Sequence, residues 1–183
     1  MYDFSKVPPN LPAPVDDGAC DHLVGLALPD VSLVDSGSGK PILMSSLAGV
    51  CVLFLYPMTG HPARALPNGW DDIPGARGCT PQACTYRDNA NRFSEHSITL
   101  YGISTQSPED QAEAKQRLAL PYSLLSDSQF DFATALSLPT FSVDSRVFLK
   151  RATLVCRDGI ITDCVYPVFP SNSDVELVLS MFA

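Results

Sequence analysis

Apolar residues gather in short runs that alternate with amphipathic segments along the chain. The clearest run is Val50–Tyr56 (VCVLFLY), which ends at Pro57. An unbroken apolar run of this length predicts a strand that is covered on both faces of a sheet. The other predicted strands are a pair joined by a turn within 23–47, then 97–105, 122–125 and 152–166. The last is divided by Asp158-Gly159, a dipeptide typical of a hairpin turn.

Helices are predicted between these strands. Thr80 is the expected N-cap of one helix and Pro81 its first helical residue, with an apolar stripe that continues to Phe93. The other predicted helices cover 107–119, 130–136 and 173–182. Ser173 and Glu176 have the spacing of a capping box. Early alternation of strand and helix with a late hairpin predicts an α/β fold in which helices flank a central mixed sheet.

Two segments lack hydrophobic periodicity. Residues 1–18 are rich in Pro and Asp and predict an extended N-terminal arm. Residues 58–78 are rich in Gly and Pro and predict a long loop, of which 58–73 is interpreted below as an insertion. A loop of this length in a compact domain is usually functional, and Trp70 within it is a candidate lid residue. The alternative is a tolerated surface loop.

Composition narrows the class of protein. The 183 residues are 45% hydrophobic and 17% charged, which predicts one ordered domain over 1–183. A net charge of −8 disfavours nucleic-acid binding. No apolar run is long enough to span a membrane, and the first residues lack the layout of a secretory signal. We therefore expect a soluble, cytoplasmic protein that binds neither nucleic acid nor membrane.

The chain has six cysteines. In a reducing compartment, a close pair is more often catalytic, redox-sensing or metal-binding than structural. Cys79 and Cys84 form such a pair outside the predicted strands. Cys51, Cys156 and Cys164 lie in apolar strand patterns and are expected to be buried, whereas Cys20 follows the arm and is expected to be exposed.

Cys79 is predicted just before a helix N-terminus, where free N–H groups and the helix dipole stabilise a thiolate. Arg77 and Arg87 are close in sequence and add positive charge. Residues five apart on a helix have Cα atoms roughly 8–9 Å apart. A disulfide needs less than about 7 Å. A bond between Cys79 and Cys84 therefore requires the first turns of the helix to unwind.

These residues resemble a known family. The matching motifs are LFLYP ending at Pro57, GCT around Cys79, C-x4-C to Cys84, TYRD at 85–88, and KRATLV at 150–155 before an Asp-Gly hairpin. In this order and spacing they resemble the peroxiredoxins, specifically the Q type, also called the bacterioferritin-comigratory type. The similarity covers about Leu26 to Phe182.

The resemblance implies a thioredoxin-like fold and a thiol-dependent peroxidase without cofactor or metal. It implies that Cys79 attacks hydrogen peroxide or an organic hydroperoxide, that Cys84 resolves the product as an intramolecular disulfide, and that Arg151 holds the thiolate. A thioredoxin-like protein would reduce the disulfide. Because no second subunit is needed, a monomer or weak dimer is expected.

One position departs from the family pattern. Three residues before Cys79, where a Thr or Ser is typical, the chain has Ala76, and the inserted loop separates Pro57 from Cys79. Our hypothesis is that Thr59 folds back to supply the hydroxyl, with Pro57 and Gly78 beside the substrate. The alternative is that the backbone N–H groups of Gly78 and Cys79 act alone.

Other readings stay open at this point. In one of them, Cys79 and Cys84 are unrelated thiols on a helix. In another, they bind a metal together with His61 and an Asp, although C-x4-C fits zinc spacing poorly. Arg87 and Asp88 form a solvated ion pair in the simplest reading. A thiol–disulfide oxidoreductase usually has C-x-x-C. A non-enzymatic redox sensor or a binding module on the same fold is distinguished from a peroxidase by peroxide turnover.

Overall fold

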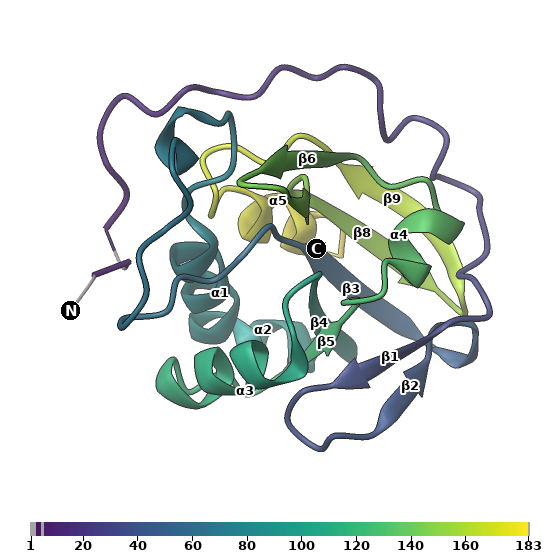
Figure 1. Cartoon of the computed structure of the whole chain (residues 1–183). Coiled ribbons are helices and arrows are strands. Elements are labelled where there is room, and N and C mark those ends of the chain that lie inside the picture. The colour runs from purple at the N-terminus through teal and green to yellow at the C-terminus, as the bar shows by residue number, and fades with distance from the viewer. Residues whose placement is uncertain (1–2, 5, 183) are drawn as a thin grey trace.

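A seven-stranded mixed sheet forms the centre of the molecule (Figure 1). The structure is a computed structural model that describes residues 3, 4 and 6–182. The strands of the sheet are β1 (Ser32–Asp35), β2 (Pro41–Leu43), β3 (Val50–Leu55), β4 (Ile98–Ser104), β5 (Ser123–Ser126), β8 (Ala152–Arg157) and β9 (Ile160–Val165). Their order is β2-β1-β5-β4-β3-β8-β9, with β3, β4 and β5 parallel and the other pairs antiparallel. The predicted mixed sheet is confirmed.

Helices lie on both faces of the sheet. They are α1 (Cys79–Asp88), α2 (Ala90–Glu95), α3 (Pro108–Arg117), α4 (Asp131–Ala135) and α5 (Asp174–Ser180), with 3-10 turns at Met44–Ser46 and Trp70–Asp72. Figure 1 shows α1, α2 and α3 grouped together, with α4 apart from them near β8 and β9. In the described part of the chain, no helix has the length and apolarity to cross a membrane.

The central strand β3 explains the apolar run. Leu53 and Leu55 pack in one core cluster with Phe132 of α4, whereas Val52 and Phe54 pack in a second cluster formed largely by α1, α2, α3 and α5. Because successive side chains of a strand point to opposite faces, a strand between two cores must be apolar at every position.

The long helix predicted through Phe93 is wrong in one respect, because it breaks at Asn89. The side-chain amide of Asn89 donates to the Thr85 carbonyl at 2.9 Å and competes with the helical backbone bonds there. The predicted capping box is also not formed. Ser173 has helical backbone angles and makes no side-chain cap, and Glu176 pairs instead with Arg92.

A second, two-stranded sheet was not predicted. It consists of β6 (Thr140–Val143) and β7 (Arg146–Leu149). The two strands are joined by Asp144 and Ser145, both with positive φ, as a tight hairpin turn requires. Asp and Ser are weaker signals for such a turn than Asn-Gly or Asp-Gly, which is why the pattern is easily missed.

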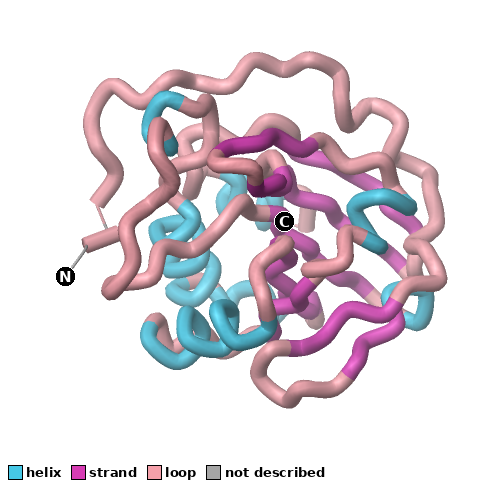
Figure 2. Tube along the Cα trace, viewed as in Figure 1, coloured by secondary structure: helices cyan, strands magenta, loops and turns pink. Residues whose placement is uncertain are grey.

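The arm runs across the molecule without regular secondary structure (Figure 2). Residues 1, 2 and 5 of the predicted 1–18 segment lie outside the described residues. Phe4 is buried, and a Cβ at Gly60 would come within 2.4 Å of its ring. The glycine therefore permits close contact between the arm and the 58–73 loop.

Candidate active site

Helix α1 begins at Cys79, so this residue is the first helical residue rather than a residue before the N-cap. Gly78 occupies the N-cap position with φ of 106°. A side chain at Gly78 is disfavoured by this φ and by space, since a Cβ would lie 2.2 Å from Ser171 Oγ. Thr80 and Pro81 follow inside the helix and do not cap it. The predicted position of the thiol near the helix N-terminus is confirmed.

The thiol of Cys79 is buried, with 4% of the residue exposed. Arg151 Nη2 lies 3.2 Å from Sγ, and the Met58 backbone N–H donates to the same sulfur at 3.4 Å. The sulfur in turn lies 3.7 Å from the Ala76 carbonyl. Two donors, one of them cationic, therefore converge on the Cys79 sulfur.

Arg151 is held in place by the protein interior. It precedes β8 and is 3% exposed. Its Nη1 donates to Gln82 Oε1 of α1. Its Nη2 also reaches the carbonyls of Gly75, Ala76 and Arg77 at 3.3–3.4 Å. The guanidinium is therefore fixed against the segment that leads into Cys79.

Sequence reasoning missed three contributors to this site. They are the Met58 N–H, Gln82 and Asp174, whose carboxylate accepts from Gln82 Nε2 at 3.1 Å. The spacing C-x-x-Q places Gln82 one helical turn after Cys79, so this residue had a usable signal. Asp174 lies 92 positions from Gln82 in the sequence and had no such signal.

Cys84 lies further along α1 and is partly exposed. Both thiols are free, and the helix between them is intact, with Gln82 N–H bonded to the Gly78 carbonyl at 3.0 Å. This is the reduced arrangement, in which the spacing of the two residues prevents a disulfide.

Thr59 does not reach the thiol. It is buried, and its hydroxyl donates to Gln106 Oε1 at 3.0 Å, as does its backbone N–H at 2.8 Å. The hypothesis that Thr59 replaces the absent hydroxyl is therefore not supported by the geometry. The group that does reach Cys79 from this loop is the N–H of Met58, directly after Pro57.

The side chains of the other candidates make no hydrogen bond to the Cys79 sulfur among the described residues. Trp70 is buried with Ala76 and Phe148, so it packs on the β6–β7 hairpin. Arg77 pairs with Asp71, and Arg87 pairs with Asp88. The metal alternative is not formed: no three His, Cys, Asp or Glu side chains group as a metal site in the ranges the structure describes.

The remaining cysteines depart from expectation at two positions. Cys20 is buried rather than exposed, with 4% accessible, and Cys164 is only partly buried. Cys51 and Cys156 are buried as predicted.

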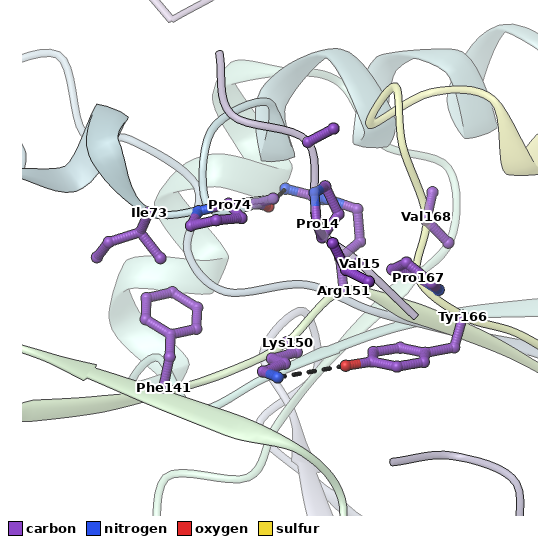
Figure 3. Close-up of a pocket in the computed structure, with 12 residues that line it drawn as sticks. Pro14, Val15, Ile73, Pro74, Phe141, Lys150, Arg151, Tyr166, Pro167 and Val168 are labelled. Carbon is purple, nitrogen blue, oxygen red and sulfur yellow. Dashed lines mark hydrogen bonds between the residues drawn. The ribbon is translucent and has the colours of Figure 1, made fainter. Parts of the chain in front are cut away.

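An apolar cavity of about 340 Å³ adjoins Arg151 (Figure 3). Pro14 and Val15 of the arm form part of its wall, and Ile73 and Phe141 form another part. Lys150 and Tyr166 also line the cavity and are bonded to each other at 3.4 Å. The cavity is thus bounded by the arm, the loop before Cys79, β6, Lys150 with Arg151, and the segment that follows β9.

Comparisons with known proteins agree with this geometry. Residues 73–163 match the AhpC/TSA family. A putative peroxiredoxin of Mycobacterium tuberculosis is 29% identical over 159 residues, which cover 85% of this chain and 93% of that protein. The chloroplastic peroxiredoxin Q of Arabidopsis thaliana is 34% identical over 104 residues, or 56% of this chain and 41% of that protein. The crystal structure of peroxidoxin BcpB from Mycobacterium tuberculosis, 28% identical, superposes with a TM-score of 0.70 over 87% of this chain and 95% of that one.

A thioredoxin-like fold with an arginine-bound cysteine at a helix start defines a thiol-dependent peroxidase. The family match and the relatives together support a Q-type peroxiredoxin. The resemblance stated from the sequence is confirmed.

Proposed function

We propose that Cys79 is the peroxidatic cysteine and that Arg151 activates it. The observation that carries the proposal is the 3.2 Å contact between Arg151 Nη2 and Cys79 Sγ at the start of α1. Arg151 Nε is buried without a hydrogen-bond partner among the described residues. A peroxide oxygen is the kind of acceptor that would satisfy this unpaired donor.

In the first step, the Cys79 thiolate attacks one oxygen of the hydroperoxide. The S–O bond forms as the O–O bond breaks, and the departing oxygen takes a proton to leave as water or an alcohol. Cys79 becomes a sulfenic acid, two electrons having passed from sulfur to the peroxide. The cationic Arg151 and the Met58 N–H would stabilise the charge that moves between sulfur and oxygen.

In the second step, Cys84 is the resolving cysteine. Its thiol attacks the Cys79 sulfenic sulfur, a disulfide forms and water leaves. Because the two residues lie five apart on an intact helix, the first turns of α1 must unwind beforehand. The peroxidase therefore alternates between a folded and a locally unwound α1.

A thioredoxin-like dithiol protein would then reduce the disulfide by thiol–disulfide exchange. Such reductants operate in reducing compartments, so a cytoplasmic location suits the cycle. Both cysteines come from one chain, so a monomer can complete the cycle. Pro57 and Gly78 would border the substrate, one preceding the Met58 N–H and the other capping α1.

The test is intact-mass spectrometry of freshly reduced protein after one equivalent of hydrogen peroxide, with peptide mapping. We expect rapid loss of two hydrogens, mapped to a Cys79–Cys84 link. Cys84→Ser should instead gain one oxygen on Cys79, and Cys79→Ser should leave Cys84 unmodified. Cys156→Ser, which removes a buried thiol away from the site, is the matched control and should behave like the parent. An unchanged mass, or oxidation scattered over several residues, would refute the assignment.

Organic hydroperoxides are included because the apolar cavity shares Arg151 with the thiol site. A charge in the cavity should disfavour an apolar substrate more than hydrogen peroxide. We expect Val15→Asp to lower the ratio of the second-order rate constants for cumene hydroperoxide and hydrogen peroxide. Val24→Asp, also exposed but outside the cavity, is the control. An unchanged ratio in Val15→Asp would exclude the cavity from substrate binding.

A further inference from the structure

The Met58 N–H that donates to the Cys79 sulfur comes from a segment without regular secondary structure. Neither Met58 nor the residues on either side of it belong to a helix or a strand. The hydrogen bonds of a helix or a sheet therefore do not hold this donor in place. A donor on a loop keeps a precise geometry only where neighbouring groups fix the backbone around it.

The sheet brings one such group to this point. Strands β3 and β4 are parallel, and Leu55 of β3 lies opposite Ile103 of β4. The carboxyl ends of parallel strands meet at the same edge of a sheet, so the segments that follow β3 and β4 leave the sheet side by side. Thr59 is in the first of these segments, directly after Met58, and Gln106 is in the second.

The side chain of Gln106 makes three hydrogen bonds to Thr59. The backbone N–H and the hydroxyl of Thr59 donate to Gln106 Oε1 at 2.8 and 3.0 Å. Gln106 Nε2 donates in turn to the Thr59 carbonyl at 3.3 Å. A primary amide can both donate and accept, so it pairs with the N–H and the C=O of one residue as a neighbouring backbone would. Both residues are buried, which shields these bonds from water.

Gln106 is itself fixed to the sheet. Its N–H donates to Ser104 Oγ at 3.3 Å, and its carbonyl accepts from Ser126 Oγ at 2.6 Å. Ser104 is the last residue of β4, and Ser126 is the last residue of β5. The side chain that holds Thr59 is therefore anchored to the ends of two strands of the central sheet.

The side chain of Met58 has different surroundings. It packs against the cluster of Trp70, Ala76 and Phe148, which lies in the 58–78 loop and the β6–β7 hairpin. Ala76 belongs to the segment that leads into α1, and α1 must unwind for Cys84 to reach Cys79. The hydrogen bonds of Gln106 instead connect the backbone beside Met58 to the sheet, which does not take part in that unwinding.

We propose that Gln106 is a positioning residue for the peroxidase reaction: it holds Thr59, and thereby keeps the Met58 N–H directed at the Cys79 sulfur. Thr59 then contributes as the point of attachment and not as a hydroxyl for the peroxide. This inference rests on the proposed function of Cys79 for its effect on rate. The position of the Met58 N–H can be measured without any peroxide.

The experiment compares the parent with Gln106→Leu, which removes all three bonds to Thr59 at similar side-chain size. In ¹⁵N–¹H spectra of the reduced protein, Cys79→Ala defines the Met58 amide resonance without the sulfur. We expect Gln106→Leu to move this resonance toward that reference. The second-order rate constant with hydrogen peroxide should fall about tenfold, less than the roughly 10²–10³-fold cost of removing a transition-state donor outright.

Gln111→Leu is the matched control. Gln111 is also a buried glutamine, and its Nε2 donates to Ser104 Oγ and the Leu125 carbonyl, both at 2.9 Å. Among the described residues its side chain makes no hydrogen bond to Met58 or Thr59. We expect this variant to lower the free energy of unfolding but to keep the parental Met58 resonance and rate. Equal effects of Gln106→Leu and Gln111→Leu on both would show a structural role only and overturn the proposal.

If Gln106→Leu fails to fold, Gln106→Asn provides the same test, because it keeps the amide but is one methylene too short to make the same bonds to Thr59. An unmoved Met58 resonance in the folded variant would overturn the positioning role. A parent protein that does not consume peroxide would refute the function proposed for Cys79 instead, and the Met58 resonance alone would then decide whether Gln106 positions this donor.

Discussion

Gln82 joins the buried carboxylate of Asp174 to Arg151, whose guanidinium contacts the Cys79 sulfur. Its amide nitrogen donates to Asp174 Oδ2 at 3.1 Å, and its amide oxygen accepts from Arg151. The same carboxylate oxygen accepts from the Tyr86 hydroxyl at 2.8 Å and the Thr153 hydroxyl at 2.6 Å. The C-terminal helix thus orients Gln82, and through it Arg151, toward the thiol.

Replacing Asp174 should affect both stability and reactivity. Asp174→Ala removes the acceptor for three buried donors, and leaving such groups unpaired costs about 1–3 kcal/mol each before relaxation. We expect the free energy of unfolding to fall by about 2–4 kcal/mol in urea titrations. Asp174→Asn keeps an acceptor oxygen and should lose less.

Stopped-flow measurement of peroxide consumption separates positioning from stability. A folded Asp174→Ala protein should react several-fold more slowly, because Arg151 loses its support through Gln82. Glu176→Ala, on the exposed side of the same helix, is the control and should keep the parental rate. A folded Asp174→Ala protein with the parental rate would contradict the positioning role.

Position 76 should not accept the hydroxyl that is typical of the family. Ala76 is fully buried in a cluster with Trp70 and Phe148, so a hydroxyl there would enter apolar surroundings. We expect Ala76→Ser to lower the free energy of unfolding by about 1–3 kcal/mol and not to raise the rate with peroxide. Ala48→Ser, at a more exposed alanine, is a control for unfolding. A faster reaction in Ala76→Ser would show that the hydroxyl reaches the substrate.

Much of the fold followed from local patterns. The buried run at β3, the Asp-Gly hairpin of β8 and β9, and the helix predicted over 107–119, which is α3, each depend on neighbouring residues, and the structure has all three. The capping box failed because a tertiary contact, Glu176 with Arg92, competed with a local one. The break of the helix at Asn89 was not predicted, because Asn is tolerated inside many helices.

The site was predictable where its residues share a motif. Cys79 and Arg151 were proposed from the motif resemblance. Gln82 could have been proposed from its spacing to Cys79 on α1. The role proposed for Thr59 was not supported, because composition cannot show which acceptor its hydroxyl bonds to. That acceptor is the side-chain oxygen of Gln106. The contact of the Met58 N–H with sulfur depends on backbone geometry, which any residue type except proline could provide at position 58.

Attachment of the arm should depend on pH through Asp17. Hydrogen bonds from Lys150 and Tyr166 lower the pKa of Asp17 from 3.8 to about 2. A lowered folded-state pKa means that this stabilisation is present above pH 3.8 and is lost as the pH falls through about 2. Lys150 has a raised pKa, so its contribution is lost again as the pH rises beyond 10.5.

We therefore expect hydrogen exchange in residues 6–18 of the reduced protein to quicken below pH 3.8, relative to the core strands. Asp17→Asn should show quicker exchange already at neutral pH. Asp16→Asn, which removes a neighbouring carboxylate that does not contact Lys150, is the control. Equal exchange in Asp17→Asn and the parent would exclude Asp17 as an anchor.

Oxidation should change the fluorescence of Trp70, the single tryptophan of the chain. Its ring packs edge-on to Phe148 at 5.0 Å and lies in one cluster with Ala76, whose carbonyl contacts Cys79. If α1 unwinds to form the disulfide, the segment through Ala76 must move, and the environment of the indole changes with it. We expect stopped-flow emission to change in two phases with peroxide, the second absent in Cys84→Ser and both absent in Cys79→Ser. A single phase of equal amplitude in the parent and Cys84→Ser would mean that disulfide formation leaves the Trp70 cluster undisturbed.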